Sequence, residues 1–163
     1  MLKIGILSDT HGYSHPKLFE FFKDCDEIWH AGDMMTSDIL IELEAITKVR
    51  AVYGNCDGWD VRGACKEVEV FDCEEHKVFL KHIVGKPGRY YSETIAQIKK
   101  HQPTIVVAGH SHILQVQHDP QYGFLFMNPG SAGRYGIHTR LTFIRFTVEG
   151  KQLSNLEIFD ELK

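Results

Sequence analysis

The feature that most constrains the fold is an alternation of short apolar runs and helical patterns over the first 53 residues. The first run is apolar almost throughout, two shorter runs follow it, and the segments between the runs carry apolar residues at helical spacing. Such an alternation is typical of α/β proteins, in which right-handed crossovers join parallel strands of a sheet covered on both faces. It predicts strands over 2–7, 27–30 and 48–53, a helix over 16–24, and a second helix after a cap at Thr36 or Ser37.

The second half of the chain changes to a largely antiparallel pattern. Residues 58–65 contain two glycines and predict a loop, and residues 85–89 predict a mobile glycine-rich loop. A helix follows, from a cap at Ser92 to an end at Pro103. We expect one domain over residues 1–163, because no repeat or linker interrupts the pattern. The remaining predicted strands lie within 68–70, 78–80, 105–108, 114–117, 124–127, 140–148 and 153–159.

Composition matters mainly for what it excludes. The net charge is −4 and the Lys and Arg residues are dispersed, which argues against long nucleic acid and an anionic membrane as partners. No apolar run is long enough to cross a bilayer, and the first residues do not form a signal peptide. The four cysteines lack Cys-x-x-Cys spacing, so we expect reduced thiols in a cytoplasmic protein.

Polar residues with metal-binding chemistry follow the predicted strands. The carboxyl ends of strands in an open α/β sheet form a ligand-binding edge, so these side chains are expected to converge. Imidazole, carboxylate and amide ligands without thiolate suit Mn²⁺, Fe, Zn²⁺ or Ni²⁺ better than Ca²⁺. Seven ligands are too many for one catalytic ion and fit two ions that share a carboxylate, about 3.5–4 Å apart. The seven residues are Asp9, His11, Asp33, Asn55, His82, His110 and His112.

The ordered set of short motifs resembles the calcineurin-like metallophosphoesterase family. The length and the Asn55-Cys56-Asp57 variant are similar to its small bacterial and archaeal phosphodiesterase branch. The resemblance implies an α/β fold in four layers, an αββα sandwich of two mixed β-sheets flanked by helices. The motifs that carry it are Asp9-x-His11, Gly32-Asp33, Gly54-Asn55-x-Asp57, His82, Gly109-His110-Ser111-His112 and the loop Asn128-Pro129-Gly130-Ser131.

The resemblance also implies roles for the seven residues. Asp9, His11 and His112 hold one ion, and Asp33 bridges to a second. Two divalent transition-metal ions, Mn²⁺ first and Ni²⁺, Fe, Co²⁺ or Zn²⁺ as alternatives, supply a bridging hydroxide that hydrolyses a small phosphodiester. The expected activity is that of a metal-dependent phosphodiesterase, a phosphoric ester hydrolase. The ligands of the second ion are Asn55, His82 and His110, and with Asp33 these are the candidate catalytic residues.

Two departures from the family pattern affect the expected substrate. Many members carry a histidine after the asparagine that protonates the leaving group, whereas this chain has Cys56. Many also read His-Gly-His where this chain reads His82-Ile83-Val84, so a second histidine near the substrate is missing. A thiol is a poor proton donor for this step, and we therefore expect diesters with good leaving groups to be hydrolysed best.

Each of these residues also has a plain structural interpretation. Asp9, Asp33 and Asn55 are common turn residues, and an isolated histidine such as His82 is more often a packing or surface residue. These interpretations do not explain why the residues occur as an ordered set. The other histidines are interpreted as surface or packing residues, and they are His15, His30, His76, His101, His118 and His138.

Several alternatives stay open at this point. Asp57 either orients a ligand or closes the Gly54 loop, and Lys86 and Arg89 either contact substrate phosphate or belong to a solvated basic loop. The protein is alternatively a phosphomonoesterase or nuclease, or a non-catalytic scaffold that binds a protein partner. The retromer subunit of this fold has an incomplete metal set, whereas all seven positions are filled here, which favours an enzyme. A homo-oligomer is compatible with the sequence.

Overall fold

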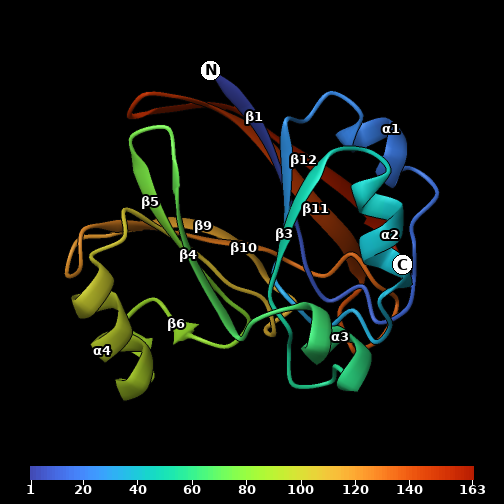
Figure 1. Ribbon diagram of the computed structural model, residues 1–163, viewed down its shortest axis with the longest axis horizontal. Coiled ribbons are helices and arrows are strands. Elements are labelled where there is room, and N and C mark those ends of the chain that lie inside the picture. The colour runs from blue at the N-terminus through green and yellow to red at the C-terminus, as the bar shows by residue number, and fades with distance from the viewer.

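The apolar runs of the first half form the parallel part of one mixed sheet. In the computed structural model, which describes residues 1–163, β1 (Leu2–Leu7), β2 (Glu27–His30) and β3 (Lys48–Ala51) are parallel neighbours. β11 (Arg140–Glu149) pairs antiparallel with β1, and β12 (Gln152–Leu162) pairs with β11. The order β12-β11-β1-β2-β3 therefore places the two ends of the sequence in the same sheet (Figure 1).

The second sheet is built from the middle of the chain and is also mixed. Its order is β4-β5-β8-β10-β9, in which β8 runs parallel to both of its neighbours. The central strand β8 is buried along its whole length, as its apolar sequence predicts. The strands of this sheet are β4 (Val68–Cys73), β5 (His76–Lys81), β8 (Ile105–Val107), β9 (Leu114–Asp119) and β10 (Phe124–Pro129).

Helices cover the outer faces of both sheets, which gives four layers (Figure 1). α1 (Leu18–Phe22) and α2 (Asp38–Glu44) pack on the first sheet in one apolar cluster, and α4 (Ser92–His101) packs on the second through Ile98. A further cluster, with side chains from β1, β2, β5 and β8, fills the space between the sheets. The structure confirms the expected αββα sandwich. None of its helices has the length and apolar character that a membrane crossing requires.

The prediction of a loop over residues 58–65 is wrong, because this segment contains α3 (Trp59–Ala64). Only one side chain of α3 is buried, that of Val61, and Trp59 is 89% exposed. A helix with a single buried position leaves no apolar periodicity in the sequence, and Gly63 lowers its helix propensity further. The helix therefore could not be recognised from the apolar pattern.

The glycine-rich segment forms a short hairpin rather than an irregular loop. β6 (Gly85–Lys86) pairs antiparallel with β7 (Arg89–Tyr90), and Gly88 takes a φ of +82° in the turn. The hydroxyl of Tyr90 donates to the Asp119 carboxylate at 2.8 Å, which ties the hairpin to the end of β9. Two-residue strands are too short to show an alternating pattern, so composition alone suggested a loop.

The ends of two helices also differ from the prediction. α1 starts at Leu18 and is shorter than the expected 16–24 segment, and α4 has Tyr91 rather than Ser92 at its cap position. Neither helix has a side-chain hydrogen bond at its cap. The polar cap signals in the sequence therefore do not mark the ends of these two helices.

Candidate metal centre

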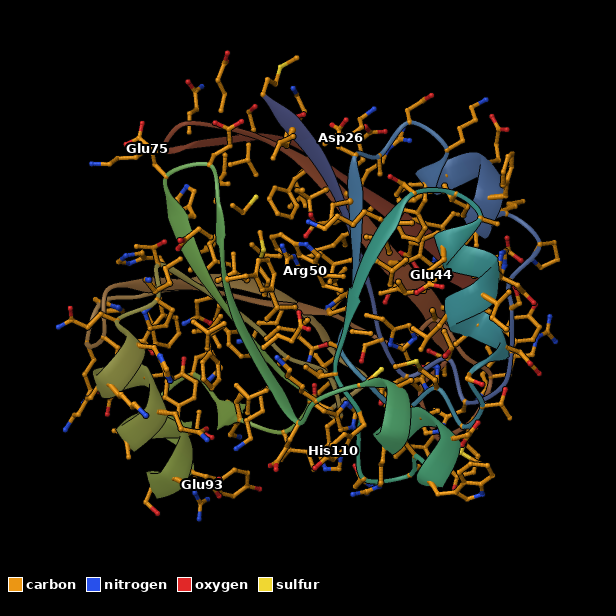
Figure 2. All side chains as sticks on the ribbon, in the orientation of Figure 1. Asp26, Glu44, Arg50, Glu75, Glu93 and His110 are labelled. Atoms are coloured by element: carbon orange, nitrogen blue, oxygen red, sulfur yellow. The ribbon has the colours of Figure 1, made fainter.

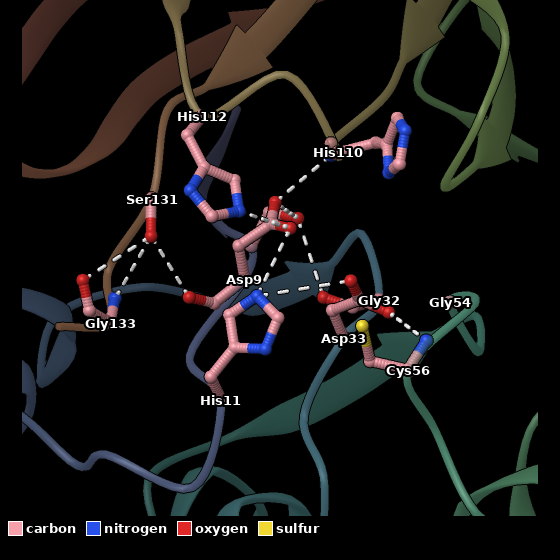
Figure 3. Close-up of polar contacts among 12 residues, drawn as sticks. Asp9, His11, Gly32, Asp33, Gly54, Cys56, His110, His112, Ser131 and Gly133 are labelled. Atoms are coloured by element: carbon pink, nitrogen blue, oxygen red, sulfur yellow. Dashed lines mark hydrogen bonds and ion pairs between the residues drawn. The ribbon is translucent and has the colours of Figure 1, made fainter. Parts of the chain in front are cut away.

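The loops after five strands converge at one edge of the molecule, where Figure 2 places His110. They bring together six of the seven predicted ligands, and Figure 3 shows Asp9, His11, Asp33, His110 and His112 among them. The loops follow β1, β2, β3, β5 and β8, so both sheets contribute. Within each of three groups, all potential ligand atoms lie within 4.8 Å of one another. The groups are Asp9, His11 and His112; His11, Asp33 and Cys56; and Asp33, His82 and His110.

Asp9 is fully buried and uses its two carboxylate oxygens differently. Oδ2 accepts hydrogen bonds from the Ser8 hydroxyl at 2.6 Å and from the His110 backbone N–H at 3.0 Å (Figure 3). Oδ1 has no hydrogen-bond partner and lies 3.1 Å from Nε2 of His112 and 3.7 Å from Nε2 of His11. One oxygen therefore holds the loops in place while the other faces imidazole nitrogens.

Asp33 divides its oxygens in the same way. Oδ1 accepts the backbone N–H of Cys56 at 2.8 Å, which links the loops after β2 and β3 (Figure 3). Oδ2 lies 3.1 Å from Nε2 of His82 and 3.8 Å from Nε2 of His11. Asp33 is thus the carboxylate that belongs to two of the three groups.

The protonation of His82 is determined by its other ring nitrogen. Nδ1 lies 2.6 Å from the Ala31 carbonyl oxygen, which can only accept, so Nδ1 carries a proton. The Nε2 atom that faces Asp33 therefore holds either a lone pair or a second proton. Burial alone would lower the pKa of His82, but the carboxylates of Asp33 and Asp9 raise that pKa above its usual value. A cation is required between these atoms, either a proton or a metal ion in its place.

The carboxylates of this site are ionised. Burial alone would raise the pKa of Asp9, but the neighbouring imidazoles of His11, His112 and His82 hold it well below its usual range. The pKa of Asp33 is likewise lowered, because the interaction with His82 outweighs burial. Three buried atoms of the site, Asp9 Oδ1, His11 Nε2 and His82 Nε2, have no hydrogen-bond partner. Buried polar atoms are normally paired, so ionised carboxylates and unpartnered imidazoles at these distances fit a divalent metal ion.

The backbone around the site is strained. Nine residues other than glycine have a positive φ, and five of them are predicted metal ligands. A left-handed conformation is costly for such residues and persists where the surrounding structure enforces it, often at functional sites. The five are Asp9 (55°), His11 (45°), Asp33 (58°), His110 (68°) and His112 (60°).

Asp57 contacts the backbone of both the Gly54 loop and the Asp33 loop. Its Oδ2 accepts the backbone N–H groups of Asp33 and Gly54, at 2.9 and 2.7 Å. Its Oδ1 accepts those of Met34 and Met35, at 2.7 and 2.8 Å. One buried carboxylate therefore closes the Gly54 loop and also holds the backbone that presents Asp33.

The Asn128–Ser131 motif connects the two halves of the site. The Asn128 amide donates to the Gly109 carbonyl at 2.8 Å and to the Ser111 hydroxyl at 3.0 Å, which supports the loop of His110 and His112. The Ser131 hydroxyl donates to the Asp9 carbonyl at 3.0 Å (Figure 3). The motif thus positions loops from both sheets.

Asn55 is the predicted ligand that the structure does not bring into the cluster. Its side chain is exposed, and its amide nitrogen lies 3.4 Å from the Cys56 sulfur. Cys56 instead approaches Asp33 and His11 within the second group of potential ligand atoms. Burial and the nearby Asp33 carboxylate raise the pKa of the Cys56 thiol, which makes it a weaker proton donor still.

Two histidines that the sequence suggested were surface or packing residues support the site directly. His30 is fully buried, accepts the Gly32 N–H at Nδ1 (3.1 Å), and contacts the Thr10 hydroxyl through Nε2 (3.1 Å). His138 contacts the ring of His112, with 3.1 Å between the two Nδ1 atoms. His30 precedes the Gly32-Asp33 motif and His138 lies outside every motif, but neither position indicates these contacts, which only the three-dimensional structure reveals.

A cavity of 540 Å³ opens beside His110. The β6–β7 hairpin forms one wall and contributes the exposed cations Lys86 and Arg89. Tyr91, which is 59% exposed, lies on the same cavity. The structure therefore places both predicted phosphate-contacting residues next to the metal-ligand cluster.

Comparison with known proteins shows similarity to phosphoesterases along nearly the whole chain. A sequence profile for the calcineurin-like phosphoesterase superfamily domain matches residues 2–151. A probable metallophosphoesterase of Methanothermobacter thermautotrophicus is 30% identical over 141 residues, covering 78% of this chain and 76% of that protein. A phosphodiesterase of Methanocaldococcus jannaschii is 29% identical over 162 residues, covering 85% of this chain and 90% of that protein. Vps29 of Chaetomium thermophilum shares the fold, with a TM-score of 0.78, 14% identity, and 99% and 98% of the two chains covered.

Proposed function

Because this chain belongs to the calcineurin-like phosphoesterase superfamily, we propose that it is a metal-dependent phosphodiesterase. The observation that carries the proposal is the set of buried, unpartnered ligand atoms Asp9 Oδ1, His11 Nε2 and His82 Nε2. A structural role alone leaves these atoms unexplained, since buried polar groups without partners are destabilising. The related protein of M. jannaschii is named a phosphodiesterase, which favours diesters over monoesters.

We assign two ion positions to the site. Asp9, His11 and His112 form the first, in agreement with the first group of potential ligand atoms. The second is formed by Asp33, His82 and His110, with Asn55 as a further ligand whose exposed side chain is free to turn toward it. Asp33 is assigned as the bridge, because its Oδ2 lies within 4 Å of imidazoles from both positions.

Two divalent ions held there would supply an activated water and neutralise charge on the phosphoryl oxygens. Mixed nitrogen and oxygen ligands without thiolate are compatible with Mn²⁺, which we propose first, and with Ni²⁺, Fe, Co²⁺ and Zn²⁺ as alternatives. Asp9 and Asp33 provide fixed negative charge to the two ion positions, and the histidine imidazoles provide the nitrogen ligands. His110 is exposed and marks the side from which a substrate reaches the centre.

The surroundings of the centre favour a small, activated diester. Cys56 stands where a proton donor is expected, and its raised pKa leaves the leaving group without a side chain that can protonate it readily. The cavity beside His110 offers Lys86 and Arg89 to a second anionic group of the substrate. We therefore assign these two cations to substrate binding and expect a leaving group that departs without protonation.

The test is a hydrolysis panel of p-nitrophenyl diesters and monoesters with metal-free protein and added Mn²⁺, Ni²⁺, Co²⁺ or Zn²⁺. We expect diester hydrolysis that requires an added metal and is lost again on chelation. Faster hydrolysis of monoesters would replace the diesterase assignment with a phosphomonoesterase. Absence of turnover with every metal would contradict the proposal and favour a non-catalytic scaffold. The likeness to Vps29 supports the fold and does not by itself favour a scaffold function.

A further inference from the structure

A second histidine stands directly behind one of the proposed metal ligands. Nδ1 of His138 lies 3.1 Å from Nδ1 of His112, and the rings are nearly perpendicular, with centroids 4.8 Å apart. Nε2 of His138 lies 3.0 Å from the carbonyl oxygen of Gly133. The three groups form a continuous chain of hydrogen bonds that ends at the atom of His112 facing Asp9.

The direction of these hydrogen bonds follows from the chemistry of each partner. A carbonyl oxygen only accepts, so Nε2 of His138 carries a proton and donates it to Gly133. In a neutral His138 the Nδ1 atom is then an acceptor, and Nδ1 of His112 must be the donor. In a neutral His112 this leaves the lone pair on Nε2, the atom that lies 3.1 Å from Asp9 Oδ1, where a metal ion can bind it. The reverse arrangement would protonate Nε2 of His112 and remove its ability to bind a metal ion.

We propose that His138 is a positioning residue that fixes His112 in the tautomer able to bind a metal ion at Nε2. The inference rests on the proposed metal centre and adds a residue from a segment outside the recognised motifs. A hydrogen bond that a ligand histidine donates from its second ring nitrogen orients the ring and raises its basicity, and its loss typically weakens metal binding by about 10- to 100-fold.

The backbone near this pair is shaped to allow the contact. Gly136 has a φ of +104°, and a Cβ atom there would lie 2.9 Å from Nδ1 of His112 and 3.2 Å from Nδ1 of His138. Any larger residue at position 136 would therefore press on the hydrogen bond itself. Gly133 fits as closely against the Asp9 loop, since its Cβ atom would lie 2.5 Å from the Asp9 carbonyl oxygen.

His82 shows the same arrangement with a different acceptor. Its Nδ1 donates to the backbone carbonyl of Ala31, which no substitution removes. His112 depends instead on a side chain, so its orientation can be altered by one substitution. The effect of changing His138 should accordingly be confined to the metal position that contains His112, and the position of His82 should be unaffected.

Zinc binding to the metal-free full-length protein, measured by isothermal titration calorimetry, tests this inference. In His138→Ala the His112 Nδ1–H loses its acceptor, and we expect one of two zinc equivalents to bind about 10- to 100-fold more weakly. His138→Asn retains an oxygen acceptor near the place of Nδ1 and should recover part of the loss. His118→Ala, at an exposed histidine on β9, is the matched control and should bind zinc as the wild type does.

Nitrogen-15 NMR of the zinc-loaded wild type identifies the tautomers of His112 and His138 without any substitution. We expect His112 protonated on Nδ1 and His138 on Nε2. A proton on Nε2 of His112, or His138→Ala binding both zinc equivalents as tightly as His118→Ala, would overturn the inference while leaving the metal centre intact. A wild-type protein that binds no zinc would overturn the metal centre together with it.

Discussion

Each buried carboxylate of the centre uses one oxygen for the fold and offers the other to a ligand. In Asp9 the structural oxygen is Oδ2, bonded to Ser8 and the His110 backbone, and in Asp33 it is Oδ1, bonded to Cys56. The sequence predicted that these carboxylates would meet the histidines, because residue type and position after a strand were sufficient. It could not predict how each oxygen is used, since this depends on backbone N–H groups that only the fold brings to each carboxylate.

A single residue, His30, also predicts how the stability of the protein depends on pH. Burial lowers the pKa of His30 from 6.5 to about 3, so the folded protein holds it neutral while the unfolded chain binds a proton below pH 6.5. Stability is therefore lost as the pH falls through this window. The contribution of His30 amounts to about 2 kcal/mol between pH 7 and pH 5.

Urea unfolding of the metal-free protein at pH 7 and pH 5 checks the prediction. In His30→Asn, which keeps an acceptor near the place of Nδ1, the drop in unfolding free energy should be smaller than in the wild type by about that amount. His118→Ala, at an exposed position, serves as the control and should retain the wild-type pH dependence. If His30→Asn loses as much stability on acidification as the wild type, His30 is not the group responsible.

At the scale of elements, the loops after β2 and β3 act as one unit because Asp57 joins them. Its carboxylate accepts four backbone N–H groups, from Asp33, Met34, Met35 and Gly54. In Asp57→Asn the amide nitrogen would face two of these donors, and hydrogen bonds to a charged acceptor would be lost. We expect a loss of unfolding free energy of about 3 kcal/mol.

Chemical denaturation of Asp57→Asn and Asp72→Asn, compared with the wild type, measures this loss. Asp72 lies in a surface ion pair and its side chain is 76% exposed, so its substitution should change stability by less than about 0.5 kcal/mol. Equal stabilities of the two variants would show that Asp57 does not hold the loops together.

Elements with an apolar run or a regular apolar pattern were predictable from the sequence, whereas α3 and the β6–β7 hairpin, which have neither, were not. The central strands β1 and β8 are buried almost throughout and carry an unmistakable apolar pattern. α3 has only Val61 as a buried residue, and the strands of the β6–β7 hairpin have two residues each. The hairpin matters for function nonetheless, because it lines the cavity beside His110.

At the scale of the whole molecule, the centre is assembled where the two sheets meet. The first sheet supplies Asp9, His11 and Asp33 from the N-terminal half, and the second supplies His82, His110 and His112. The rule that ligands bind at the carboxyl ends of strands predicted this meeting. The contact of His138 with His112 was not predictable, because residues 132–139 carry no motif and reach the site only through the fold.

The central claim is that Asp33 joins two metal positions in one site. The most direct measurement is the number of Mn²⁺ equivalents bound per chain, determined calorimetrically for the metal-free wild type, Asp33→Asn and Asn55→Ala. We expect two equivalents in the wild type, a severe loss of both in Asp33→Asn, and weakening of only one in Asn55→Ala. A wild type that binds one equivalent or none, or an Asp33→Asn variant that still binds two with unchanged affinity, would contradict the account.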